Sequence, residues 1–451
     1  MKRINVGLIG YGSVGSGFTE YFYKSNNANL EQFNLAAIGI KDIKKERDFP
    51  MTKITTNSLY DIIRNASIDI VVDTVGGDEE SNQCSFEFME AALKHGKHVI
   101  TANKSTLAQH LPYLVGLAEQ HQVNLEYEAS VCGSIPIVQS MKDYYINDKI
   151  TKIIGILNGT SNYILTQMQK WKSYAEALAE ARQLRIAEAD SSADVNGKDV
   201  ADKLAILAML AFGIPLSPKD ITIEGIEYLD KDDFFYVRDN LRLRTGKEHT
   251  IKLLGIAELR ETMLDLRVHP AYIRADHPLY GVDDTLNAVC ITGKYGTVSV
   301  LKGVGAGSLP TGFAVASDLI RVGKKIQRGI VENFVPRAPP KEALALEHRL
   351  VGEHRMTVGY IKSDSPEHKV GILAQKSTIL AKHGISIKDW FNFVERETGD
   401  PEEIIPDIFL IEKARENAIT AALDDFAKQE ICASGKVTYL REDDTTTRTR
   451  K

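Results

Sequence analysis

A glycine-rich turn near the N-terminus restricts the fold more than any other feature of the sequence. Residues 4–9 (INVGLI) form an apolar run, Gly10–Gly15 reads GYGSVG, and Phe18 and Phe22 then share one face of an expected helix. In a GxGxxG turn the first glycine makes the tight bend, the second lets the backbone approach a pyrophosphate, and the third allows close helix–strand packing. The turn therefore predicts a dinucleotide site, with a purely structural turn as the alternative. The residues expected to contact the dinucleotide are Gly10, Gly12, Ser13, Val14 and Gly15.

Short β-branched runs separated by helical patterns continue to about residue 135. Strands are expected at 35–40, 68–72 and 98–100, with a helix over 86–95. This alternation predicts an α/β fold that begins with a Rossmann-like parallel sheet, covered by helices on both faces. We place the nucleotide-binding domain at residues 1–135.

The choice between NADP and NAD depends on the loop after the second strand. An acidic residue such as Asp42 would hold a ribose 2′-OH, whereas basic residues would hold a 2′-phosphate. Lys41 is closer to the strand end, and Lys44, Lys45 and Arg47 follow. The loop favours NADP, with NAD, or a solvated loop that contacts no cofactor, as the alternatives.

Composition and charge exclude several classes of protein. The chain has 451 residues, 43% hydrophobic and 26% charged, which fits two or three folded domains rather than a disordered chain. A net charge of −6 argues against nucleic acid or an anionic membrane as the partner. No apolar run approaches the ~20 residues of a membrane span, and the start lacks a secretory signal pattern. The 4 cysteines are far apart in the sequence, so disulfides are not expected. We therefore expect a cytoplasmic location.

Two further units are expected after the nucleotide-binding domain. Residues 136–302 combine predicted strands with a long apolar helix, which indicates an α+β domain. Residues 336–348 are proline-rich and read as a linker, and 442–451 as a frayed tail. Between them, residues 349–441 follow the order β-α-β-β-α-β, which is a ferredoxin-like arrangement.

An aspartate and a lysine share the apolar surface of the helix expected over residues 198–212. Asp199 and Lys203 are one turn apart, and the helical period continues their stripe through Ile206 and Leu210. Removing both charges from water costs several kcal/mol per ion unless they are paired. We therefore expect a functional site there, with a structural ion pair as the alternative. Acidic residues just before the helix, which could bind a substrate ammonium group or complement the helix N-terminus, are Glu188, Asp190 and Asp194.

Taken together, these and other stretches resemble homoserine dehydrogenases. The resemblance covers about the first 330 residues in the family's order, and the C-terminal unit resembles an ACT domain, an amino-acid-sensing module. The stretches that carry it are Gly10–Gly15, TANK at 101–104, EASVCGSIP at 128–136, NGTSNY at 158–163, the segment 188–203, and GVGAG at 303–307 with Pro310 and Thr311.

The resemblance implies the interconversion of aspartate 4-semialdehyde and homoserine with NAD(P)H, a step of threonine and methionine biosynthesis. It makes Lys203 the proton donor to the aldehyde oxygen, with Asp199 orienting it. Glu188 and Asp194 are expected to bind the substrate, and Lys104 to lie between nicotinamide and substrate. The residues expected to approach the cofactor outside the glycine turn are Lys41, Thr101, Lys104 and Gly305.

The resemblance also assigns a loop and a returning segment. Segment 303–335 is expected to complete the nucleotide-binding domain. Cys132 is expected to be a small buried cysteine rather than a nucleophile, because reduction to an alcohol needs no thioester. The residues that match a loop for a monovalent cation such as Na⁺, bound mainly by backbone carbonyls, are Glu128, Val131, Gly133 and Ile135. A turn that joins two domains is the alternative for this loop.

The ACT-like unit departs from the usual pattern in its first loop. Residues 366–373 read PEHKVGIL, so Lys-Val stands where a proline usually precedes the glycine. The fold should survive this change. Threonine is the effector that the resemblance suggests, and the tendency of ACT units to pair favours a homodimer or homotetramer.

Two other functions compete with this enzyme. One is a catalytically silent amino-acid sensor with a bound dinucleotide, which the joint presence of Lys203, Asp199, Glu188 and Lys104 disfavours. The other is a different nicotinamide-dependent reductase of an amino-acid-derived carbonyl, which the segment 188–203 disfavours.

Overall fold

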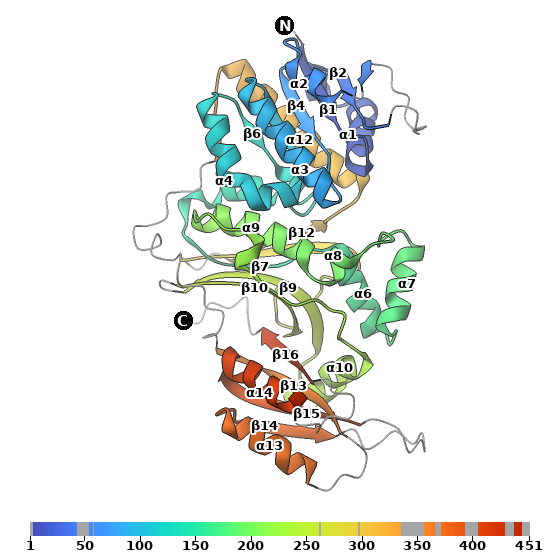
Figure 1. Cartoon of the computed structure of the whole chain (residues 1–451), viewed down its shortest axis with the longest axis vertical. Helices are drawn as coiled ribbons and strands as arrows, with labels where there is room; N and C mark the ends of the chain where they lie inside the picture. The colour runs from blue at the N-terminus through green and yellow to red at the C-terminus, as the bar shows by residue number, and fades with distance from the viewer. Residues whose placement is uncertain are drawn as a thin grey trace.

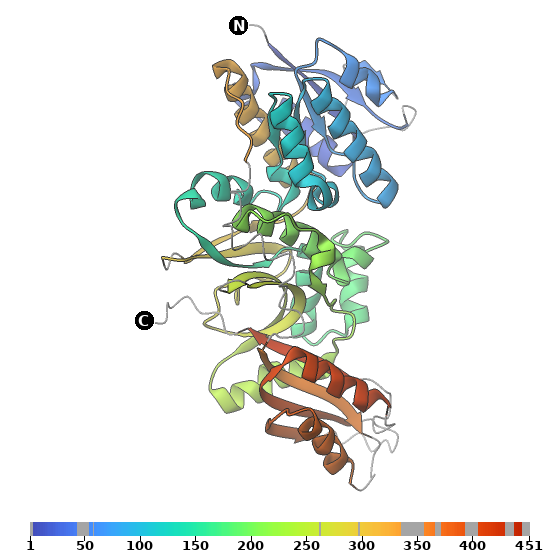
Figure 2. The ribbon, with the colours of Figure 1, turned by 60° about the vertical axis from the view of Figure 1, so that its left-hand side comes forward.

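The computed structural model stacks three units along the long axis of the molecule (Figures 1 and 2). It describes residues 3–42, 54–56, 58–260, 263–295, 298–334, 356–365, 371–392, 405–428 and 437–443. The expected linker 336–348 lies outside these residues. No helix in the described part of the chain is long and apolar enough to cross a membrane.

The N-terminal unit is built on a six-stranded sheet, as the alternating pattern predicts. Its strands are β1 (Ile4–Ile9), β2 (Phe33–Gly39), β3 (Ile54–Thr56), β4 (Ile70–Asp73), β5 (His98–Thr101) and β6 (Leu125–Glu126). The order is β3-β2-β1-β4-β5-β6 and every pair is parallel. The order reverses between β1 and β4, so the carboxyl ends of these strands border the crevice where such sheets bind ligands.

Helices cover the sheet and a late segment of the chain completes this unit. The helices are α1 (Ser13–Lys24), α2 (Leu59–Arg64), α3 (Glu79–Lys94), α4 (Lys104–Gln120) and the returning α12 (Ser308–Arg328). Glycines let α1 and α12 touch: a Cβ on Gly17 would lie 2.0 Å from the Ser308 carbonyl oxygen, and one on Gly312 only 2.3 Å from the Phe18 nitrogen.

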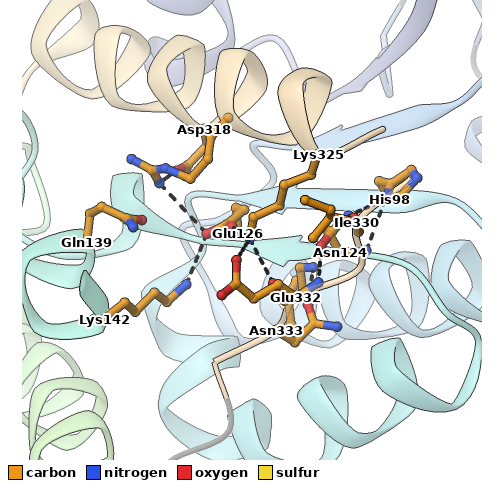
Figure 3. Close-up of polar contacts among 12 residues, drawn as sticks. His98, Asn124, Glu126, Gln139, Lys142, Asp318, Lys325, Ile330, Glu332 and Asn333 are labelled. Carbon is orange, nitrogen blue, oxygen red and sulfur yellow. Dashed lines mark hydrogen bonds and ion pairs between the residues drawn. The ribbon is translucent and has the colours of Figure 1, made fainter. Parts of the chain in front are cut away.

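A buried carboxylate anchors the far end of α12. Glu126 on β6 accepts hydrogen bonds from Lys325 of α12 at 2.8 Å and from Lys142 of α5 (Ile137–Asp143) at 3.0 Å. Figure 3 shows the two lysines reaching Glu126 from different elements. Burial alone would raise the pKa of Glu126, but the surrounding cations outweigh burial and hold it well below its usual range.

The middle unit places one buried helix against an antiparallel sheet. Its strands run in the order β12-β11-β7-β9-β10, and the short β8 pairs with β10 in parallel. Its elements are β7 (Ile150–Ile156), α6 (Gly159–Gln169), α7 (Tyr174–Gln183), α8 (Ser192–Val195), α9 (Lys198–Phe212), β8 (Thr222–Ile223), α10 (Lys231–Phe235), α11 (Leu241–Thr245), β9 (His249–Arg260), β10 (Met263–Arg274), β11 (Leu286–Gly293) and β12 (Val298–Val304). The predicted helix 198–212 is confirmed as α9, which is buried over nearly its whole length and ends at Gly213 in a left-handed conformation (φ +68°).

The C-terminal unit has the predicted β-α-β-β-α-β order. Its elements are β13 (Met356–Ser365), α13 (Ile372–Lys382), β14 (Ile387–Asn392), β15 (Ile405–Arg415), α14 (Glu416–Lys428) and β16 (Val437–Asp443). Its strands form an antiparallel sheet in the order β16-β13-β15-β14.

This unit is not separate from the middle unit, because their sheets are continuous. Residues 441–443 of β16 pair in parallel with 271–273 of β10, which joins both sheets into one of ten strands. The expectation of a frayed tail from residue 442 is wrong for its first two residues. Glu442 and Asp443 extend β16 because the middle unit offers them partners: the Tyr272 hydroxyl, 3.3 Å from Glu442, and the His277 ring, 3.2 Å from Asp443.

The close contact between α1 and α12 makes a prediction about stability. Gly312→Ala places a methyl group against the backbone of α1, so the free energy of unfolding should fall by about 1–3 kcal/mol, as in other overpacked sites. The matched control is Gly116→Ala in α4, where a Cβ meets nothing within 4 Å. This control should gain about 0.5–1 kcal/mol from helix propensity. Urea unfolding measures both, and equal changes in the two variants would contradict the packing.

Candidate active site

The glycine turn has the geometry of an anion-binding loop. Gly10 adopts φ +92°, and its Cβ would lie 2.9 Å from the Thr74 carbonyl carbon after β4. A Cβ on Gly15 would lie 2.5 Å from the Gly10 oxygen, whereas a Cβ on Gly12 would meet nothing within 4 Å. No side chain caps the N-terminus of α1, which begins at Ser13. The turn thus leaves open backbone at Gly12 and free N–H groups on α1, an arrangement that fits a dinucleotide pyrophosphate.

The loop that distinguishes NADP from NAD is described only at its start. Lys41 lies two residues beyond β2, with 94% of its side chain exposed and its ammonium 3.7 Å from the Glu80 carboxylate. Asp42 is also exposed. Lys44, Lys45 and Arg47 lie outside the described residues.

The charged pair on α9 is buried and tightly paired. Lys203 Nζ lies 2.7 Å from Asp199 Oδ2 and donates to the Leu157 carbonyl, also at 2.7 Å, just after β7. The Asp199 and Lys203 side chains are 6% and 9% exposed. The prediction that α9 buries both charges on one surface is confirmed.

A second lysine reaches the same carboxylate from the nucleotide-binding domain. Lys104 is the first residue of α4, and its Nζ lies 2.8 Å from Asp199 Oδ1. Asn103 positions this first turn, because its side chain accepts a hydrogen bond from the Thr106 backbone. Thr101, at the end of β5, in turn accepts from the Asn103 N–H and donates to the buried carboxylate of Asp73. The carboxyl edge of the nucleotide-binding sheet therefore meets the buried helix of the middle unit at Asp199.

The electrostatic balance of this junction favours an ionised Asp199. Burial alone would raise the pKa of Asp199, but Lys104 and Lys203 outweigh burial and hold it well below its usual range. In return, the charge of Asp199 raises the pKa of Lys104 above its ordinary value. One carboxylate thus stabilises two ammonium groups that come from two domains.

Asn158 completes the junction, although the sequence analysis assigned it no role. Its amide nitrogen donates to Asp194 at 2.6 Å and to Asp199 at 2.8 Å, and its side-chain oxygen accepts from the Ser161 backbone and begins α6. An asparagine directly before a helix is the signal that could have identified a cap. Burial, and then the neighbouring Asp199, raise the pKa of Asp194. Asp194 is therefore brought to the site, as predicted.

Glu188 is placed less directly. It lies exposed in the loop between α7 and α8 and makes no hydrogen bond or ion pair with other described residues. Its contact with a substrate stays a prediction.

The predicted cation loop packs where the returning segment crosses. Gly133 adopts φ +51°, and a Cβ there would lie 2.8 Å from the Gly305 carbonyl oxygen. The buried Glu128 carboxylate accepts hydrogen bonds from the N–H groups of Val138 and Gln139, so it caps α5. Among the predicted carbonyl ligands, those of Glu128 and Ile135 already accept a backbone hydrogen bond. A carbonyl oxygen has two lone pairs, so a cation can still be bound.

Cys132 in this loop is buried. The Asn287 amide lies 3.7 Å from its sulfur, and burial raises the pKa of the thiol to about 11. A thiol of this kind is protonated near neutral pH and is a poor nucleophile, as the sequence analysis expected. No group of three or more His, Cys, Asp or Glu side chains in the described part of the chain could hold a metal ion.

The site can therefore bind a dinucleotide at one domain and present a buried ammonium group from the other. Comparison with known proteins gives one match for the N-terminal unit and another for the middle unit. The family model described as "Homoserine dehydrogenase, NAD binding domain" matches residues 10–128, and the model described as "Homoserine dehydrogenase" matches residues 136–320.

Individual relatives match over about three quarters of the chain or more. A homoserine dehydrogenase of Pseudomonas aeruginosa is 34% identical over 448 residues, which cover 98% of this chain and 99% of that protein. One from Bacillus subtilis is 37% identical over 339 residues, 74% of this chain and 76% of that protein. The crystal structure of a homoserine dehydrogenase from Thiobacillus denitrificans superposes with a TM-score of 0.84 at 31% identity, covering 98% of this chain and 99% of that one. The chain belongs to the homoserine dehydrogenase family.

Proposed function

We propose that Lys203, Asp199 and Lys104 carry the reaction of this homoserine dehydrogenase, the reversible reduction of L-aspartate 4-semialdehyde to L-homoserine with NAD(P)H. The observation that carries the assignment is the Asp199 carboxylate, which pairs with Lys203 and Lys104 at 2.7 and 2.8 Å. This arrangement brings two ammonium groups to the meeting point of a dinucleotide-binding sheet and a buried helix.

Lys203 acts as the proton donor. The bound dinucleotide supplies the hydride, and negative charge then develops on the aldehyde oxygen. An ammonium group has three N–H donors, and Asp199 and the Leu157 carbonyl engage two of those on Lys203. The third N–H is left for the aldehyde oxygen. The ammonium group stabilises the negative charge on that oxygen and then gives it a proton, which leaves Lys203 as a neutral amine. In the oxidation of homoserine the neutral amine takes the hydroxyl proton.

The neighbouring residues bind and orient the substrate. The Lys104 side chain is 39% exposed and that of Lys203 only 9%, so Lys104 is the lysine with room to turn toward the substrate. Asp194, next to Asp199, and Glu188, in the preceding loop, supply the negative charge that the substrate α-ammonium group needs. Glu188 is exposed, and its contribution requires this loop to close over the substrate.

NADP is the proposed cofactor, and Na⁺ or a similar monovalent cation is a proposed ligand of the Glu128–Ile135 loop. Lys41 supports the choice of NADP, because its exposed ammonium group lies just beyond β2, where a 2′-phosphate would bind. The cation would be held by the backbone carbonyls of the loop, and the close contact of Gly133 with Gly305 would couple it to the cofactor side of the site.

The C-terminal unit is proposed to be an ACT-type regulatory domain that responds to threonine. Two ion-pair clusters join it to the middle unit. Arg441 of β16 donates to both Glu224 oxygens at 2.6 and 2.7 Å. Lys362 of β13 lies 2.7 Å from both Asp230 and Asp233.

The segment that receives these ion pairs also touches the active site. Ile226, two residues after Glu224, donates its N–H to the Val195 carbonyl at 2.9 Å. Val195 is adjacent to Asp194 and lies three residues before the start of α9. A shift of β16 would therefore be transmitted through Glu224 and Ile226 to Asp194 and Asp199.

A homodimer or homotetramer is the proposed assembly. The edge strand β12 leaves Val300 and Val304 exposed, at 41% and 43%, on the end of the ten-stranded sheet. Light scattering on the protein as it leaves a size-exclusion column would give the mass of the assembly.

Removal of the proton donor is the direct test of the mechanism. Homoserine-dependent reduction of NADP, followed by absorbance at alkaline pH, should be present in the unchanged protein. It should fall by about 10²–10⁴-fold in Lys203→Met, the range for lost general acid–base catalysis. Cofactor affinity should stay within a few-fold, because Lys203 belongs to the middle unit. Lys198→Met, at the exposed first residue of α9, is the matched control and should keep full activity. Loss of cofactor binding in Lys203→Met would contradict the assigned role.

Cofactor preference is tested at Lys41. Lys41→Gln removes a charge from the proposed 2′-phosphate site, so the KM for NADP should rise about tenfold, as for one charged hydrogen bond. The KM for NAD should not change. Lys24→Gln, on the surface of the same domain, controls for a general charge effect. An equal change for both cofactors would exclude Lys41 as the residue that distinguishes them.

Regulation is tested by removing an ion pair between the C-terminal unit and the middle unit. Deleting residues 349–451 would uncover the buried carboxylate of Asp233 and the edge of β10, so point variants are preferable. L-Threonine should lower the initial rate of the intact protein, and Glu224→Gln should weaken this inhibition several-fold without changing the basal rate. Asp425→Asn, whose carboxylate pairs only within the C-terminal unit among the described residues, is the control. A rate that does not respond to threonine in the unchanged protein would contradict the proposed effector.

A further inference from the structure

The first turn of α4 makes two polar contacts with α9, and only one of them belongs to the proposed chemistry. Lys104 pairs with Asp199 at 2.8 Å. The next residue, Ser105, donates its hydroxyl to Asp202 Oδ2 at 2.5 Å. Because Asp199 and Asp202 are three residues apart, they lie on neighbouring positions of the same helix surface. The two contacts therefore cross the boundary between the nucleotide-binding and middle units side by side.

Asp202 is an unfavourable residue for the stability of α9. It is 4% exposed, and among the described residues the Ser105 hydroxyl is the only hydrogen-bond partner of its carboxylate, on which the charges of Lys104 and Lys198 act without a hydrogen bond. Burial raises the pKa of Asp202 above its usual range, with the Ser105 hydrogen bond opposing the shift. Alanine at this position would have a better helix propensity and no desolvation cost. Stability of the helix alone does not account for a carboxylate here.

The contact with Ser105 gives Asp202 a role that Asp199 cannot fill during turnover. The pairing of Lys104 with Asp199 must loosen when Lys104 turns toward the substrate. The Ser105–Asp202 hydrogen bond involves no group that touches substrate, so it persists through that step. It then remains as a polar restraint on the position of the first turn of α4 relative to α9.

We propose that Ser105 and Asp202 are a positioning pair, which keeps the hydride-donating domain in register with Lys203 while Lys104 serves the substrate. This inference rests on the proposed function of the site. Displacements of about 1 Å at a reacting centre can cost on the order of 10²-fold in rate, so a single interdomain hydrogen bond is sufficient to affect turnover.

The test combines activity with stability in the full-length protein. Asp202→Ala should lower kcat/KM for homoserine by about 10–100-fold and raise the KM for homoserine, while the Kd for NADP, measured by fluorescence titration, stays unchanged. The Tm of this variant should equal or exceed that of the unchanged protein, because a half-satisfied buried carboxylate has been removed. Asp202→Asn keeps an acceptor for Ser105 and should recover most of the activity.

A double-mutant cycle identifies the pair. Ser105→Ala should reproduce the effect of Asp202→Ala on kcat/KM, although its Tm should fall because the buried Asp202 carboxylate loses its partner. The kcat/KM of the double variant should be no lower than that of either single variant, because all three lack the same hydrogen bond. Glu119→Ala, an exposed change in the last turn of α4, is the control and should have normal kinetics.

The outcomes separate this inference from the function on which it rests. If the unchanged protein does not oxidise homoserine, the proposed function fails. If it does and Asp202→Ala retains normal kcat/KM, the positioning pair is wrong. A loss of activity in Asp202→Ala that follows a fall in its Tm, or additive effects on kcat/KM in the double variant, would also overturn the positioning role.

Discussion

The structure depends on one carboxylate shared between two domains. Asp199 is nearly inaccessible to water, yet it remains ionised because ammonium groups approach both of its oxygens. Removing such a charge from water is costly unless its partners are well placed. The burial of α9, the cap on α4 and the turn after β7 all contribute to this placement. The proposed mechanism depends on this arrangement, because Asp199 holds the ammonium group of Lys203 in a largely buried position.

The same principle recurs wherever units of the chain meet. Glu126 on the N-terminal sheet binds α12 through Lys325 and α5 through Lys142. Asp233 joins the C-terminal unit to the middle unit through Lys362. A buried ion pair adds little net stability compared with apolar packing, but breaking one is costly. Such pairs fix how units are placed, which suits the proposed site, where the cofactor and the proton donor come from different domains.

Local patterns in the sequence predicted the parts of the site that lie within one element. The glycine spacing predicted the open turn at Gly12, and the helical period predicted that Asp199 and Lys203 share a buried surface. The order of strands and helices in the C-terminal unit was also predictable, because each element has its own periodicity. The resemblance to a family placed Lys104 and Asp194 at the site, where the structure brings both near Asp199.

Contacts between elements distant in sequence were not predictable in this way. The bond from Asn158 to Asp199 joins residues 41 positions apart, and the Ser105–Asp202 contact joins residues 97 apart. No local period encodes either one. The pairing of β16 with β10 was missed for a related reason: Glu442 and Asp443 look like a polar tail until the middle unit supplies their partners. Glu188 was predicted from the sequence but makes no hydrogen bond or ion pair with the described residues of the site, since its proposed role requires its loop to close over the substrate.

The most direct test of the shared carboxylate is the rate of hydride transfer in a single turnover. Asp199→Asn keeps the shape of the side chain and removes its charge, so both lysines lose their counter-ion. With NADP bound at saturation and homoserine mixed in a stopped-flow instrument, the account predicts hydride transfer at least about 100-fold slower than in the unchanged protein, with cofactor affinity intact. An unchanged rate of hydride transfer in Asp199→Asn would contradict it.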